Sequence, residues 1–168
     1  YHALDHALQI ERQAYTDAMT QVKNRAALNL KIEQLNAAAS PRLTLFMVDL
    51  NNLKQVNDTL GHPAGDKLIC STVRYLKEAF GSIGTIYRYG GDEFVVIIDD
   101  SSMEDVTRAR EIFDQLLLQH AQRGGCEISV AIGMASRMEP QHDKLHVSEL
   151  LHLADVAMYR IKARQKNA

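Results

Sequence analysis

Two short β-rich runs joined by a turn with two glycines place the strongest constraint on how this chain can fold. The runs cover residues 83–89 and 94–98, and this pattern predicts a β-hairpin with antiparallel strands. An apolar run at 43–48 predicts a buried strand, and an alternating run at 126–133 predicts another. Amphipathic helical patterns lie between these strands. We therefore expect an α/β (α+β) fold in which helices flank a mixed, largely antiparallel central sheet, and not a doubly wound parallel sheet.

The N-terminal segment has the pattern of a helix without a start signal. Residues 1–19 contain no turn former and place Leu4 and Leu8 at helical spacing. We interpret residues 1–16 as the end of an upstream linker or signalling helix and residues 17–168 as one globular domain. This interpretation predicts an upstream sensory or regulatory domain in the full-length protein. A short amphipathic helix that packs on its own domain is the alternative, which the sequence leaves open.

The composition excludes several classes of protein. With 168 residues, 46% of them hydrophobic, the chain can form a single globular domain with a sizeable core. Its formal net charge of -2 lacks the basic field that DNA or RNA polymers require, so we expect neither as a partner. No apolar stretch reaches the roughly 20 residues of a membrane span, so we expect a cytoplasmic domain, with membrane tethering of the full-length protein left open. Cys70 and Cys126 fall within apolar patterns and are predicted to be buried thiols in a reducing compartment.

Three acidic residues follow the predicted strand and the hairpin turn. Asp49 ends the apolar run, whereas Asp92 and Glu93 come directly after the two glycines. Taken alone, Asp49 is typical of a helix cap, and adjacent acids in a turn are typical of exposed turn residues. A hairpin tip beside the end of the neighbouring strand would instead bring the three acids together, and such a cluster needs a counter-cation. Carboxylates together with substrate phosphates suit Mg²⁺, so a two-metal phosphoryl-transfer site is our hypothesis.

Groups that could hold phosphates are spread over two predicted helices. The chain contains no Gly-x-x-x-x-Gly-Lys-Ser/Thr loop, which excludes a P-loop site. Residues 51–54 are predicted to open a helix after the buried strand, where backbone amides bind anions and Lys54 adds a charge. Lys162 and Lys166 lie four residues apart on one face of the last predicted helix, where they could reach a terminal phosphate. The alternative for these two lysines is a solvated helix end favoured by the helix dipole.

Five blocks of the sequence occur in the order and spacing of GGDEF domains. The block at 88–94 reads RYGGDEF and contains the family signature itself. The other four resemble the opening motif, the substrate segment, a late strand and the last helix of the family, and they are residues 17–25, 49–66, 129–133 and 154–162. The chain is therefore identified as a member of the GGDEF-type diguanylate cyclase family, with residues 17–168 as the catalytic domain. The resemblance implies a fold similar to the palm of nucleotidyl cyclases.

The resemblance also implies roles for individual residues. It places metal ligands at Asp49, Asp92, Glu93 and the carbonyl of Leu50, with two Mg²⁺ ions in each active half-site and Mn²⁺ as an alternative metal. Asp92 would bind metal or help to deprotonate the attacking 3′-hydroxyl, and the implied catalytic residues are Asp92, Glu93 and Lys54. The implied GTP-binding residues are Asn52, Leu53, Lys54, Asn57, Asp66, Gly90, Gly91, Lys162 and Lys166. Among these, Asn57 and Asp66 would recognise guanine, because a carboxylate accepts from N1–H and N2–H while an amide serves the remaining edge.

The implied reaction condenses two GTP molecules into cyclic di-GMP and releases two pyrophosphates. Because the product has two-fold symmetry, a homodimer with two facing half-sites is the simplest catalyst. Three alternatives to this interpretation are a degenerate domain that binds GTP or a cyclic dinucleotide and signals without turnover, an enzyme that makes a hybrid cyclic dinucleotide, and a structural dimerisation domain. The intact acids argue against the first, the guanine-type residue Asp66 against the second, and the five-block match against the third.

The chain departs from the family pattern at four places. Asn51 stands where the family often has a second Asp, and Gln21 replaces the usual Gly. Residues 165–167 read Gln-Lys-Asn where the family has Gly-Arg-Asn, so Lys166 keeps the charge but loses the bidentate fork of arginine, which favours weaker triphosphate binding. The family's inhibitory product motif, Arg-x-x-Asp, should lie just before the hairpin, where residues 81–84 read Gly-Ser-Ile-Gly. We expect no inhibitory product site there.

Overall fold

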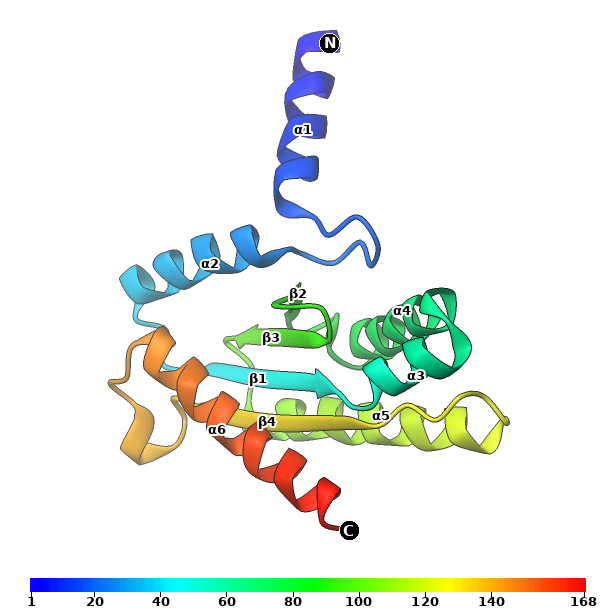
Figure 1. Ribbon diagram of the computed structural model, residues 1–168. Helices are drawn as coiled ribbons and strands as arrows, with labels where there is room; N and C mark the ends of the chain where they lie inside the picture. The colour runs from blue at the N-terminus through cyan, green and yellow to red at the C-terminus, as the bar shows by residue number, and fades with distance from the viewer.

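A four-stranded antiparallel sheet with the strand order β2-β3-β1-β4 forms the centre of the computed structural model, which describes residues 1–168 (Figure 1). Its strands are β1 (Leu43–Leu50), β2 (Thr85–Arg88), β3 (Glu93–Asp99) and β4 (Val130–Ser136). The hairpin predicted from the glycine turn is β2–β3, and β1 is the buried central strand that its apolar run predicts. The expected fold, an antiparallel sheet flanked by helices, is confirmed.

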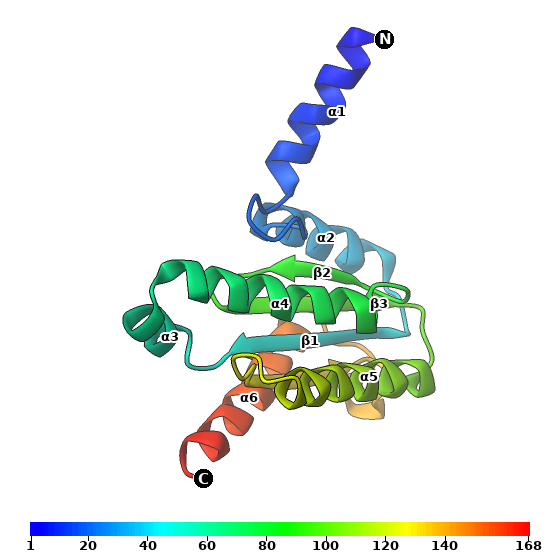
Figure 2. The ribbon, with the colours of Figure 1, turned by 90° about the vertical axis from the view of Figure 1, so that its right-hand side faces the viewer.

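Helices cover both faces of the sheet (Figure 2). α4 and α5 pack on one face, and α2 and α6 pack on the other, so that the core is divided into two apolar clusters. Asn24 and Ser102 begin two of these helices with side chains that accept hydrogen bonds from backbone amides of the first turn. The bounds of the four helices are α2 Arg25–Ala38, α4 His62–Phe80, α5 Met103–Gln122 and α6 Val147–Lys166, and a 3₁₀ turn at Pro140–His142 precedes α6.

The side chains of β1 alternate between these two clusters. Phe46 and Val48 belong to the cluster under α4 and α5, whereas Leu45 and Met47 belong to the cluster under α2 and α6. Successive side chains of a strand point to opposite faces, so Asp49 continues the second series. The central strand thereby aims a carboxylate at the face that α6 covers.

A short helix, α3 (Leu53–Leu60), connects the end of β1 to α4 and packs beside α4. Asn52 precedes it in a left-handed conformation, with φ 62, which turns the chain sharply after the strand. Gly61, at φ 88, then separates α3 from α4, and glycine adopts this conformation without steric penalty. The two helices place residues 53–66 next to the end of β1 where Asp49 lies.

The late strand begins later than the alternating pattern predicts. The pattern starts at Cys126, but β4 starts only at Val130. β4 pairs with β1 alone, and Val130 lies opposite Leu50, the last residue of β1, so the residues before Val130 have no strand to pair with. The small face of this strand does receive a helix closely, because a Cβ added at Gly133 would lie 2.2 Å from the backbone of α6.

The prediction that both cysteines are buried is wrong. Cys70 and Cys126 are both exposed. The core-facing stripe of α4 contains Leu68, Ile69 and Val73, and Cys70 falls outside it. Cys126 lies in the irregular segment before β4, outside any helix or strand.

The N-terminal helix α1 (His2–Tyr15) extends away from the rest of the chain (Figures 1 and 2). None of its residues is buried, and Leu4 and Leu8 are among its exposed side chains. In this structure α1 therefore buries none of its side chains against the rest of the chain. Neither α1 nor any other helix has the length and apolarity that a bilayer crossing requires.

Candidate active site

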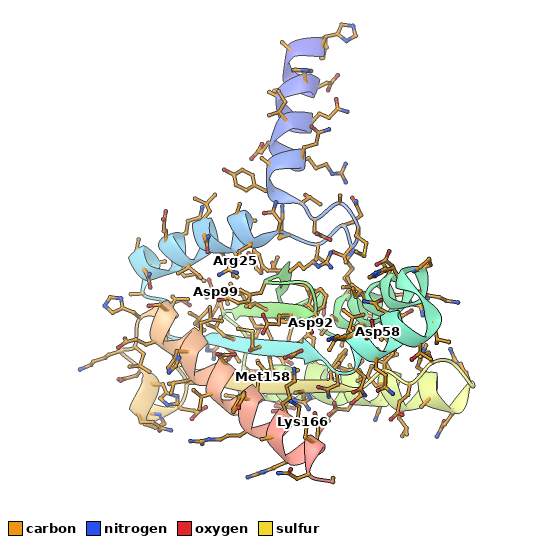
Figure 3. All side chains as sticks on the ribbon, viewed as in Figure 1. Arg25, Asp58, Asp92, Asp99, Met158 and Lys166 are labelled. Atoms are coloured by element: carbon orange, nitrogen blue, oxygen red, sulfur yellow. The ribbon has the colours of Figure 1, made fainter.

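Two of the three acids lie directly opposite each other at one end of the sheet. Asp49 in β1 is the register partner of Glu93, the first residue of β3, and Asp92 precedes Glu93. The carbonyl of Asp92 accepts a hydrogen bond of 2.8 Å from the amide of Leu50, which ties the hairpin to the end of β1. Figure 3 shows Asp92 at the end of the sheet that faces α3. The hairpin thus lies beside the end of the neighbouring strand, as the sequence hypothesis required.

The carboxylate of Asp49 is buried and only half satisfied. Its side chain is 8% exposed, and Oδ2 accepts from Nζ of Lys162 in α6 at 2.6 Å. Oδ1 is buried and has no hydrogen-bond partner. The helix-cap interpretation does not apply, because Asn52 precedes α3 and its start has no side-chain cap. A buried carboxylate oxygen without a donor is a place where a cation fits.

The acids do not form a closed metal cage in this conformation. No three carboxylate, thiol or imidazole side chains lie close enough together to enclose an ion. Lys162 instead provides the positive charge beside Asp49, with 27% of its own side chain exposed. The oxygen donors that suit Mg²⁺ are therefore present at the sheet end, but a lysine neutralises one of them.

Electrostatic repulsion is concentrated on Glu93. Burial raises the pKa of Glu93 above its usual range, and the negative charges of Asp49, Asp92 and Asp155 raise it further, whereas Lys162 lowers it. Asp155 of α6 was not predicted as part of this cluster. It lies seven residues before Lys162, which is two helical turns, so helical spacing predicts that the two share a face of α6 but not that this face reaches Asp49. The sheet end therefore carries excess negative charge that a divalent cation would relieve.

Arg88 holds the glycine turn and links it to the segment that follows α1. Its guanidinium donates to the carbonyls of Gly90 and Gly91 at 3.3 and 2.9 Å. It also donates to both carboxylate oxygens of Asp17 at 3.2 and 3.1 Å. Burial alone would raise the pKa of Asp17, but hydrogen bonds from Thr20 and Arg88 outweigh it and the pKa is lowered. The sequence predictions assigned no role to either member of this ion pair.

The end of α6 is tied to the sheet by two of the residues that depart from the family pattern. Nδ2 of Asn51 donates to Oε1 of Gln165 at 2.8 Å and lies 3.0 Å from Oγ of Ser129. Nε2 of Gln165 donates to the carbonyl of Val130 at 2.9 Å. Asn51 and Gln165 thus act together as one clamp between β1, β4 and α6. The clamp lies within one helical turn of Lys162.

The remaining predicted site residues of α3, α4 and α6 differ in how far they are exposed. Asn57 of α3 is half-buried, and Asp66 of α4 and Lys54 of α3 are exposed. The first turn of α3, which contains Leu53, lacks a side-chain cap, so its amides remain available to an anion. Lys166 is exposed in the last turn of α6, at the far end of that helix in Figure 3. The structure brings Lys162 to the acids and leaves Lys166 at the periphery.

Comparison with known proteins agrees with this arrangement. The chain matches the family model described as "Diguanylate cyclase, GGDEF domain" over residues 14–168. It is 34% identical over 166 residues to signaling protein YkoW of Bacillus subtilis, a match that covers 95% of this chain and 20% of YkoW. It is 33% identical over 155 residues to diguanylate cyclase DgcZ of Escherichia coli, which covers 90% of this chain and 51% of DgcZ. The chain therefore spans about half or less of the length of these relatives.

A solved structure shares the fold. The crystal structure of the coiled coil and GGDEF domain of DgcB from Caulobacter crescentus in complex with c-di-GMP has a TM-score of 0.82 to this chain. The match has 24% sequence identity and covers 96% of this chain and 87% of the DgcB chain. The chain therefore has the same fold as this solved structure.

Proposed function

This chain belongs to the GGDEF domain family of diguanylate cyclases, and from that premise we propose that it condenses two GTP molecules into cyclic di-GMP and two pyrophosphates. One observation carries the proposal. The buried oxygen Oδ1 of Asp49 has no partner and lies at the sheet end where Glu93 stands opposite Asp49. An unpartnered buried carboxylate oxygen among further acids is unfavourable unless a cation binds there in the working state.

The residues present fit a divalent metal site. Asp49, Glu93, Asp92 and the carbonyl of Leu50 would hold Mg²⁺, two ions in each half-site, and Mn²⁺ would suit the same oxygen donors. When bound, the ions supply the positive charge that stabilises attack of a 3′-oxygen on the α-phosphorus and the departure of pyrophosphate. The acids themselves position this charge, and Asp92 is our candidate to accept the proton of the 3′-hydroxyl.

The basic residues would hold the triphosphate. Lys54 and the amides at the start of α3, including those of Asn52 and Leu53, offer one anion site. Lys162 is paired with Asp49 in this structure, and a triphosphate would offer its ammonium group a second anionic partner. Lys166 would contact the outer phosphates as a point charge. Gly90 and Gly91 would let the hairpin backbone approach the substrate closely.

Guanine recognition is proposed for two neighbouring helices. Asp66 would accept hydrogen bonds from N1–H and N2–H, and the amide of Asn57 would serve the O6 side of the base. Adenine has neither of these two donors on that edge, so the pair would favour GTP over ATP.

Since each subunit would bring one GTP, catalysis requires two facing copies, whose pairing an upstream sensory or regulatory domain would control. We place this reaction in the cytoplasm, whether or not the full-length protein is tethered to a membrane.

A second candidate function is a domain that binds GTP or cyclic di-GMP and signals without turnover. The ion pair between Lys162 and Asp49 favours this alternative, because it occupies a carboxylate that a cyclase would use for metal. The two candidates differ in one consequence. A binding module retains the nucleotide unchanged, whereas a cyclase releases pyrophosphate.

The test is to incubate the chain at high concentration with GTP and Mg²⁺ and to separate the nucleotides by chromatography. We expect cyclic di-GMP with the unmodified chain and none with Glu93→Ala, which removes a metal ligand. ATP in a parallel reaction tests the role of Asp66. Unchanged GTP that co-elutes with the protein would support the binding module, and unchanged GTP without binding would reject both candidates.

A further inference from the structure

At Gly65 in α4, atoms of α3 occupy the space that a side chain would need. It is buried in the first turn of α4. A Cβ added to Gly65 would lie 1.8 Å from Oδ1 and 2.8 Å from Cγ of Asn57, which is in α3. The next nearest atom would be Cδ1 of Leu53 at 3.2 Å. The side-chain amide of Asn57 therefore rests directly on the backbone of Gly65.

Backbone conformation does not explain glycine at this position. Gly61 and Gly124 are the glycines with positive φ, and Gly65 is not among them. Alanine is a better helix former than glycine, so local propensity alone would favour a side chain here. What excludes a methyl group is the amide of Asn57. No intramolecular hydrogen bond holds that amide, so its place depends on the atoms that it packs against.

We propose that Gly65 is a positioning residue for base selection: it seats the amide of Asn57 beside Asp66 so that the two side chains present one recognition edge to guanine. The proposal rests on the function proposed above, since it assumes that this edge reads the base of GTP. Asp66 directly follows Gly65, so the same turn of α4 contains the carboxylate and the residue on which the Asn57 amide packs.

The position of the Asn57 amide decides which base it can recognise. The amide of Asn57 offers NH₂ donors to the O6 side of guanine, where adenine instead carries an amino donor. A site that fixes polar groups against one pattern of donors and acceptors rejects a base with the opposite pattern, because the base would cover these groups and leave them unpaired. An amide displaced by a methyl group at position 65 would lose this contact and the selectivity that comes with it.

The substitution Gly65→Ala should displace a side chain and leave the backbone in place. The three nearest atoms that a new Cβ would meet outside its own helix backbone are in the side chains of Asn57 and Leu53. At Gly81, by contrast, a Cβ would lie 2.4 Å from the backbone carbonyl of Lys77. Gly81→Ala is therefore a matched control, which disturbs the other end of the same helix without touching Asn57.

The experiment measures binding of 3′-deoxy-GTP and 3′-deoxy-ATP by calorimetry in the presence of Mg²⁺. Neither nucleotide can condense, because each lacks the attacking hydroxyl. We expect Gly65→Ala to bind 3′-deoxy-GTP about tenfold more weakly, the effect of losing one hydrogen bond to the base, with little change for 3′-deoxy-ATP. Asn57→Ala should show the same loss. The double variant should be no weaker than Asn57→Ala alone, since Gly65 acts through Asn57.

Thermal unfolding distinguishes a positioning role of Gly65 from a role in the packing of α4. Gly65→Ala should unfold at or above the temperature of the unmodified chain. Gly81→Ala should unfold at a lower temperature and keep its preference for the guanine nucleotide. Equal weakening toward both nucleotides, a further loss in the double variant, or a fall in unfolding temperature with Gly65→Ala would overturn the inference.

The same series distinguishes this inference from the proposed function. If Asn57→Ala weakens guanine binding and Gly65→Ala does not, the positioning role alone is wrong. If Asn57→Ala binds like the unmodified chain, or if the unmodified chain binds neither nucleotide, the proposed guanine site is wrong and this inference falls with it.

Discussion

Lys162 donates a 2.6 Å hydrogen bond to Oδ2 of Asp49, across the contact between α6 and β1, while Oδ1 of the same carboxylate has no partner. The lysine neutralises one acid at a sheet end where Glu93, Asp92 and Asp155 add further negative charge. In the proposed reaction this ammonium group can pair with either of two anions, the carboxylate of Asp49 or the triphosphate. The ion pair therefore links the stability of the folded chain to whether metal and nucleotide are bound at the site.

Removing this lysine should destabilise the chain in a way that a metal ion repairs. Lys162→Met would leave Asp49 buried without its counter-ion, a change that costs about 3 kcal/mol of unfolding free energy. Because Mg²⁺ would take over the charge, added Mg²⁺ should stabilise this variant more than the unmodified chain. Urea denaturation with and without Mg²⁺ measures both effects. Lys166→Met, an exposed lysine in the same helix, is the control and should change stability little; equal loss in both variants would show that the ion pair is unimportant.

The Asp17–Arg88 pair predicts a pH dependence of stability. The pKa of Asp17 is lowered from its ordinary value of 3.8, so its ionised form is favoured in the folded chain. Its contribution is complete above the pKa of the unfolded chain and disappears as the pH falls through the lower pKa of the folded chain. Asp17→Asn should therefore be less stable than the unmodified chain at pH 7, and the difference should shrink below pH 4.

Urea denaturation from pH 7 to pH 3 gives this difference at each pH. A constant difference across the range would mean that Asp17 acts through packing and not through its charge. Asp114→Asn is a suitable control, because Asp114 pairs with Arg110 on an exposed helix surface and contributes little at any pH.

The clamp at the end of α6 predicts coupling between two residues. Asn51→Asp removes the donor that Oε1 of Gln165 accepts from and places two oxygens opposite each other, which should cost about 1 kcal/mol of unfolding free energy. Gln165→Ala should cost a similar amount. In the double variant the two losses should not add, with a coupling energy of at least about 0.5 kcal/mol. Additive losses in denaturation experiments would show that the residues act independently.

The close contact between β4 and α6 predicts a severe effect of a single methyl group. Gly133→Ala would place Cβ 2.2 Å from backbone atoms of Ala154 and Met158, which cannot rotate away. We expect a loss of about 3 kcal/mol or failure to fold, because the helix must shift off the sheet. Gly91→Ala is the matched change, since a Cβ there meets no atom within 4 Å. Thermal unfolding of both variants tests the contrast, and similar unfolding temperatures would contradict it.

Local patterns in the sequence were sufficient for the elements that position the acids. The apolar run and the glycine turn predicted β1 and the β2–β3 hairpin, because strand alternation and turn chemistry depend on neighbouring residues. The opposition of Asp49 and Glu93 then follows from pairing the hairpin with the strand end. The same sequence could not show that Lys162 reaches Asp49, since that contact depends on how α6 lies across the sheet.

The wrong predictions have the same physical origin. The alternating pattern predicts a strand at Cys126, but β4 begins only at Val130 because its partner strand β1 ends at Leu50. The exposure of Cys70 depends on which side of α4 faces α3 and the sheet, and an apolar residue at the edge of a helical stripe does not reveal this. The packing of Asn57 on Gly65 is likewise a contact between two helices that no local pattern encodes.

The central claim is that this site joins two GTP molecules, and the most direct test is the ratio of the two products over time. With Mg²⁺ and a high concentration of the chain, we predict two pyrophosphates for every cyclic di-GMP formed, and neither product with Glu93→Ala. Pyrophosphate release that persists in Glu93→Ala, or GTP that stays intact with the unmodified chain under these conditions, would contradict the account.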